Sequence, residues 1–154
     1  MSLDPSSQSP IFRGAGTQTL RRVGAYQVSG IPFVTGSNGQ MTDEQEACVK
    51  FPNVTKSITV INSGSAVNTE LRIHFVSSSA GSVTSAAEHH YITLGSTGDS
   101  VTFNVKCKEI YITSIGTAGF ELFAELTTIP TSSMFDLNVS GSGLLGPGTD
   151  FSDF

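Results

Sequence analysis

The histidines are the residues of this sequence that could most readily take part in chemistry. His89 and His90 precede Tyr91, and His74 is the third histidine of the chain. Imidazole nitrogens bind metals such as Zn²⁺. Adjacent side chains on a strand point to opposite faces, so His89 and His90 cannot readily share one ion. No aspartate stands at a fixed spacing from them, and the pattern therefore predicts polar strand-edge histidines without a metal or other cofactor.

The two cysteines offer no better nucleophile. Cys48 and Cys107 form no CxxC pair and no disulfide framework. Cys107 alternates with Phe103 and Val105, which predicts a buried and chemically inert thiol. Serines are numerous, but none lies in a G-x-S-x-G elbow. We therefore expect no catalytic activity, and the rival hypothesis, an enzyme on a cupin-like barrel that uses the three histidines, predicts metal in the purified protein.

Carboxylates of the last clear strand also lack the spacing of an active-site pair. Glu121 and Glu125 share a strand face with Phe123 and lie about 13 Å apart at ~3.3 Å per residue. Glycosidases place their two carboxyl groups closer together, across a cleft. The pattern predicts a solvated face of a sheet.

The elements that carry these residues are predicted to be β-strands. Seven alternating runs, separated by Gly-, Ser- or Pro-bearing breaks, cover residues 47–51, 55–62, 69–76, 89–94, 100–107, 109–115 and 120–130. An eighth strand is expected from "IPFV" at 31–34 or from "SMFDLNV" at 133–139. No convincing helix lies between them. The sequence therefore predicts an all-β fold, an antiparallel eight-stranded jelly-roll sandwich with an extended N-terminal arm.

One detail of the pattern concerns the stretch from Cys107 to Pro130. It reads as two alternating strands joined by the glycine turn "GTAG". Just before it, at Lys108 and Glu109, the alternation slips by one residue. A slip of one residue predicts a bulge or a sharp corner.

The two ends of the chain differ from the middle in composition and charge. Residues 1–42 are predicted to form an arm, residues 43–130 the sandwich and residues 131–154 a glycine-rich tail. The arm has three arginines against Asp4, whereas residues 109–154 have six acidic residues and no Lys or Arg. We expect the ends to mediate contacts between copies of the chain. The candidate interface residues are Arg13, Arg21, Arg22, Leu144, Leu145, Phe151 and Phe154.

Bulk properties exclude several partners. The net charge of −5 argues against general nucleic-acid binding, which requires phosphate-neutralising Lys and Arg. The sequence has no apolar run long enough to span a bilayer, and its start lacks the apolar core of a signal peptide. We expect synthesis in the cytosol, with free, buried thiols.

The order of the segments, together with "VKCKEIYI" and "AELTTIP" before a glycine tail, resembles small jelly-roll capsid proteins of large icosahedral DNA viruses. The nearest type is the penton or a minor capsid protein of algal viruses, and phage head-decoration proteins are similar in composition. The resemblance covers about residues 50–146. It implies a virion structural protein, made in the host cytoplasm, that forms pentamers or trimers and contacts the major capsid protein through its terminal arms.

A binding module is the alternative from another class. A receptor- or carbohydrate-binding spike or head domain would place its site on the loops at 77–88 and 95–100. It predicts glycan binding by the isolated domain.

Overall fold

The computed structural model describes residues 30–67, 69–77 and 90–136. Within these segments the chain is all-β, apart from one 3-10 turn at Thr131–Ser133. The strands are β1 (Ile31–Gly36), β2 (Glu46–Lys50), β3 (Asn53–Asn62), β4 (Thr69–His74), β5 (Ile92–Leu94), β6 (Ser100–Phe103), β7 (Glu109–Gly116) and β8 (Phe120–Pro130). None of the helices in the described segments is long and apolar enough to cross a membrane.

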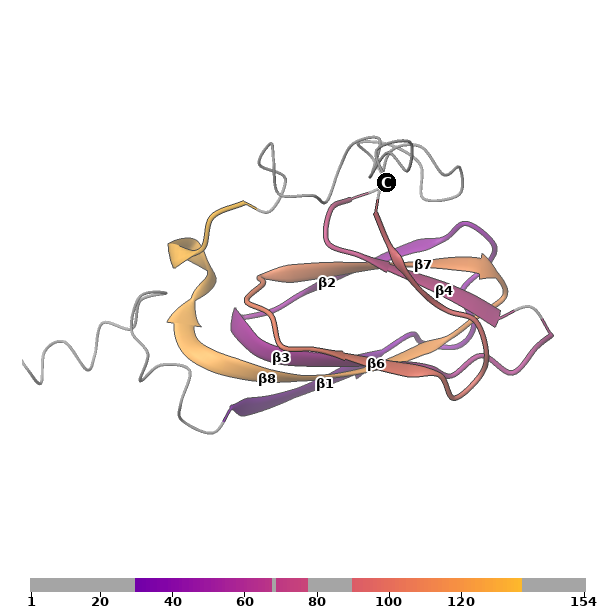
Figure 1. Cartoon of the computed structure of the whole chain (residues 1–154), viewed down its shortest axis with the longest axis horizontal. Coiled ribbons are helices and arrows are strands. Elements are labelled where there is room, and N and C mark those ends of the chain that lie inside the picture. The colour runs from indigo at the N-terminus through magenta and orange to yellow at the C-terminus, as the bar shows by residue number, and fades with distance from the viewer. Residues whose placement is uncertain (1–29, 68, 78–89, 137–154) are drawn as a thin grey trace, which may run out of the picture.

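The strands form two antiparallel four-stranded sheets. One sheet has the order β1-β8-β3-β6, and the other has the order β2-β7-β4-β5. Figure 1 shows the two sheets as stacked layers, with β2, β7 and β4 above and β3, β8, β1 and β6 below. Two stacked sheets bury their facing sides and leave two outer faces.

The strand pairing is nested. β1 pairs with β8, β2 with β7, β3 with β6, and β4 with β5. Two further ladders, β3 with β8 and β4 with β7, complete the two sheets. Only β4 and β5 are both consecutive in the chain and paired with each other, because every other described connection carries the chain from one sheet to the other.

The predicted strands at 109–115 and 120–130 therefore follow each other without pairing. β7 lies between β2 and β4, whereas β8 lies between β1 and β3 in the other sheet. The predicted corner at Lys108 and Glu109 is confirmed, because there the chain crosses from the sheet of β6 to the sheet of β7. The slip in alternation marks this change of sheet.

The core lies between the sheets and follows the alternation of the strands. Its most completely buried apolar side chains come from both sheets: Val54, Ile58 and Val60 of β3, Leu71 and Ile73 of β4, Ile110 and Ile112 of β7, and Leu122 and Ile129 of β8. Burial of each such side chain contributes about 1.5 to 3 kcal/mol. Their outward neighbours are the residues available for function.

The eighth strand comes from "IPFV", which forms β1 within the range assigned to the arm. Because β1 pairs along β8 from Ile31 to Gly36 and Met41 is 5% exposed in the core, the sheet structure begins before residue 43. The described part of "SMFDLNV" forms no strand, although Met134 reaches the core with 6% exposure. Its remainder, like residues 1–29, lies outside the described residues.

Candidate functional site

His74 is buried on the outer side of the β2-β7-β4-β5 sheet, with 1% of its surface exposed. Its Nδ1 lies 2.7 Å from the carbonyl oxygen of Val76, and its Nε2 lies 2.8 Å from Oγ1 of Thr113. A carbonyl oxygen only accepts, so Nδ1 carries the proton and donates it. Oε2 of Glu46 is 3.6 Å from Nε2. Both ring nitrogens therefore have protein partners, and His74 links β4 to β7 rather than presenting a base to solvent.

The same outer side carries Tyr111, Glu109 and Cys48. The Tyr111 ring stacks on His74 with 5.8 Å between ring centroids, and its hydroxyl donates to Oε1 of Glu109 at 2.9 Å. Burial and the hydrogen bond to Glu109 raise the pKa of Tyr111. Cys48 is exposed, so the prediction of buried thiols is wrong for this residue, although desolvation by neighbouring groups raises its pKa. A reactive thiol requires a lowered pKa, so Cys48 is not set up as a nucleophile.

Cys107 is fully buried, as its alternation with Phe103 and Val105 predicts. Its sulfur lies 3.4 Å from Oγ1 of Thr55, and the Cys107 amide donates to the same oxygen at 3.0 Å. Burial raises the pKa of Cys107 to about 11. The thiol is a packing group that joins β3 to the segment before β7.

The two described histidines differ in their surroundings, because His74 is buried on β4. His90 is exposed and His89 lies outside the described residues. In the segments that the structure describes, no three His, Cys, Asp or Glu side chains lie close enough to hold an ion.

The outer face of the other sheet is different, because apolar side chains are exposed on it. Val34 of β1 is 74% exposed and Phe123 of β8 is 41% exposed, and the two are direct cross-strand partners. Val34 and Phe123 belong to a row of successive cross-strand partners. The row continues through Thr59 of β3 and Thr102 of β6, whose hydroxyls lie 2.8 Å apart. It therefore crosses all four strands of the sheet.

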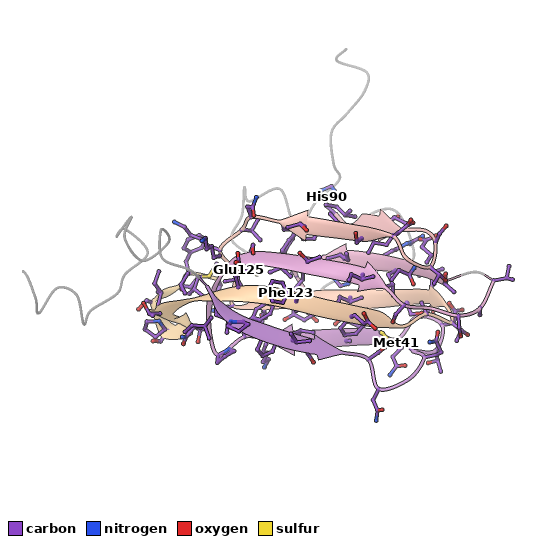
Figure 2. The ribbon with its side chains drawn as sticks, turned by 90° about the horizontal axis from the view of Figure 1, so that it is seen from below. Met41, His90, Phe123 and Glu125 are labelled. Carbon is purple, nitrogen blue, oxygen red and sulfur yellow. The ribbon has the colours of Figure 1, made fainter. Side chains whose placement is uncertain are left out.

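Glu121 and Glu125 flank this row on β8, both pointing outward as predicted. Oε2 of Glu125 accepts a hydrogen bond from Ser57 at 2.7 Å, which fixes this carboxylate beside Phe123. Figure 2 labels Phe123 and Glu125 on the face turned to the viewer. We call the surface formed by Val34, Phe123, Glu121 and Glu125 the acidic–apolar face. Exposed apolar groups rimmed by polar residues are typical of interaction surfaces.

A second surface lies where the two sheets meet at β1 and β2. A groove of about 500 Å³ runs there, with Phe33, Met41, Val49 and Phe120 among its lining residues. Among the described strands, β1 pairs only with β8 and β2 only with β7. Each thus has one edge without a described partner strand, the kind of edge to which another chain can add.

The seven interface candidates from the sequence all lie outside the described residues, so the structure does not place them. The loop at 77–88 of the alternative hypothesis is described only at Ser77, whose hydroxyl lies 3.2 Å from Oε1 of Glu46. In the loop at 95–100, Asp99 closes its own turn by accepting from the Ser96 amide at 2.8 Å. The sequence showed Phe123 between two glutamates, but only the register places Val34 next to it.

Together, these features define, over the described residues, an all-β body of two antiparallel four-stranded sheets with Val34 and Phe123 exposed on one outer face. No known family model matches the sequence, and no curated protein matches it. Among solved structures, the chain is similar to the crystal structure of SPBc2 prophage-derived protein YomS, with 16% sequence identity and a TM-score of 0.44. The match covers 63% of this chain and 96% of that chain.

Proposed function

We propose that this protein is a virion structural subunit, a penton or minor capsid protein with a jelly-roll body and no catalytic activity. The observation that carries the proposal is the nested pairing of eight strands, first with last and so on inward, across two four-stranded sheets. Jelly rolls are eight-stranded, two-sheet folds that recur in viral capsid and lectin domains.

The chemistry of the outer faces favours a structural role over the other uses of this architecture. On the β2-β7-β4-β5 sheet, the polar side chains are bound to protein partners. His74 bonds to Thr113, and Tyr111 stacks on His74 and donates its hydroxyl hydrogen to Glu109. The pKa values of Cys48 and Cys107 are raised, which opposes thiolate chemistry. On the other sheet, by contrast, Val34 and Phe123 are exposed. A capsid subunit needs a rigid body with adhesive surfaces, and its association relies on such apolar contacts.

The partners in this proposal are other copies of the chain and the major capsid protein. A pentamer suits a vertex, and a trimer suits a decoration or spike position. The protein would be made in the host cytoplasm and reside in the capsid. The net charge of −5 makes nucleic acid an unfavourable partner.

The first test is the absolute mass of the full-length protein by light scattering, with negative-stain imaging of the same peak. A pentamer or trimer is expected. A monomer would then be mixed with the major capsid protein encoded in the same genome, and incorporation into its shells would support a minor capsid role. A monomer that binds no shell would contradict the proposal.

Removal of the N-terminal segment provides a second test. A chain that starts at residue 31 retains every described strand, so it is expected to keep its β-rich circular dichroism spectrum. We expect it to lose incorporation into particles. Normal incorporation of the folded, shortened chain would contradict a role of the arm in assembly.

A further inference from the structure

The residues paired with the two glutamates of the acidic–apolar face are uncharged, and the nearest basic residue on β3 is Lys56, in the bulge beside Ser57. Glu125 faces Pro32 on β1 and Ser57 on β3. Glu121 faces Gly36 and Ile61 in the same way. Two carboxylates therefore flank the exposed pair of Val34 and Phe123. A complementary partner would be cationic and partly apolar.

The N-terminal segment of this chain has that composition. Residues 1–29 contain Arg13, Arg21 and Arg22 against one acidic residue, Asp4. Leu20 and Val23 flank the arginine pair, and Tyr26 and Val28 follow it. The segment thus combines two adjacent cations with apolar groups, as the face combines two anions with apolar groups.

The segment also joins the body at this face. A Cβ atom on Gly30 would lie 2.4 Å from Cβ and 3.0 Å from Cα of Glu125, so the backbone passes directly against this residue. Only glycine allows an approach this close. The point where the N-terminal segment joins the body therefore lies at this face.

The length of the N-terminal segment sets which faces its arginines can reach. Arg21 and Arg22 precede Gly30 by nine and eight residues, which spans roughly 26 to 30 Å when extended at ~3.3 Å per residue. The carboxylate-bearing residues of the same copy lie nearer, with Glu125 at Gly30 and Glu121 about 13 Å further along β8. The segment is therefore long enough for its arginines to reach the face of a neighbouring subunit.

We propose that the acidic–apolar face binds the N-terminal segment of a second copy, with Arg21 and Arg22 against Glu121 and Glu125 and the adjoining apolar side chains over Val34 and Phe123. This inference rests on the proposed function as a self-assembling subunit. It gives the predicted arm a defined receiving surface. Exchange of arms is reciprocal when two such faces approach each other.

Paired charge reversals test the inference in the full-length protein. One variant is R21E/R22E, and the other is E121R/E125R. In either variant alone, the arm and the face carry charges of the same sign and repel each other. Light scattering at low salt is therefore expected to show at least about tenfold weaker association. Mixing the two variants should restore association, because each arm then meets a face of opposite charge. If E125R disturbs folding through the lost Ser57 bond, E121R alone is used.

A control variant, T93K/S96K, adds two positive charges at exposed positions on β5 and the turn after it, in the other sheet. It should associate like the wild type. If it weakens association as strongly as the reversals, net charge alone explains the effect and the inference is wrong.

The remaining outcomes separate the inference from the proposed function. A wild-type oligomer that both reversals leave unchanged would overturn the inference and leave the capsid proposal standing. The four reversals can also be combined in one chain. If association recovers in that chain but not when the two double variants are mixed, the arm binds its own subunit and the inference is wrong. A wild-type monomer that binds shells would likewise refute arm exchange between copies while supporting a minor capsid role.

Discussion

Asn62 is predicted to be the polar residue on which the alignment of the two sheets depends most. It ends β3 in one sheet and is 1% exposed. Its side-chain amide donates to the carbonyl oxygens of Thr69 and Leu94, on β4 and β5 of the other sheet, the latter at 3.2 Å. Its Oδ1 accepts from the Gly64 amide at 3.0 Å. One side chain thus satisfies three backbone groups, two of them in the other sheet.

Asn62→Ala would leave these three groups without their partner. Each buried polar group left unsatisfied costs about 1 to 3 kcal/mol. A water molecule that enters the space would recover part of this. We therefore expect the free energy of unfolding to fall by about 3 to 5 kcal/mol, a large share of the ~5 to 15 kcal/mol typical of a domain.

Urea denaturation followed by tyrosine fluorescence and circular dichroism measures this loss, since the chain has three Tyr and no Trp. Asn53→Ala is the matched control, because Asn53 is half-buried and its amide makes one bond, to the Thr127 carbonyl at 2.9 Å. The control should lose about 1 kcal/mol. If Asn62→Ala loses no more than the control, the inferred role of Asn62 between the sheets is wrong.

Three further predictions concern the thiols and His74. Because the pKa of Cys107 is raised from 9.0 to about 11, the unfolded chain ionises first as the pH rises. The free energy of unfolding should then fall between about pH 9 and 11 by at most ~3 kcal/mol, and Cys107→Ala should remove this part of the pH dependence in urea titrations. A disulfide reagent should label Cys48, which is exposed, in native buffer and Cys107 only after unfolding; two labels in native buffer would contradict the burial of Cys107. His74→Ala should lower the free energy of unfolding by about 2 to 4 kcal/mol, because Thr113 and Val76 lose a buried partner, and an unchanged melting temperature would rule this out.

The chemistry of the candidate site was only partly readable from the sequence. Alternation correctly placed Glu121, Phe123 and Glu125 on one outward face and Cys107 in the core. The prediction of a polar strand-edge histidine is wrong for His74, which is buried on the outer side of its sheet. A period of two residues says which side of a sheet a residue occupies, but not what covers that side. The bonds of His74 to Thr113 and Val76 depend on contacts that no local pattern contains.

What the sequence determined by itself was the set of strands and their facing. The eight strands of the structure are the seven runs and one of the two segments expected from it, because alternation and turn residues act locally along the chain. Tertiary structure decided which strands pair: the stretch from Cys107 to Pro130 looked like two joined strands, yet β7 and β8 belong to different sheets. Which strands pair depends on how the core is filled. Ile110, Ile112 and Leu122 are buried there together with residues that are far away in the chain. The contact of Val34 with Phe123, 89 positions apart, exists for the same reason, and with it the surface proposed for assembly.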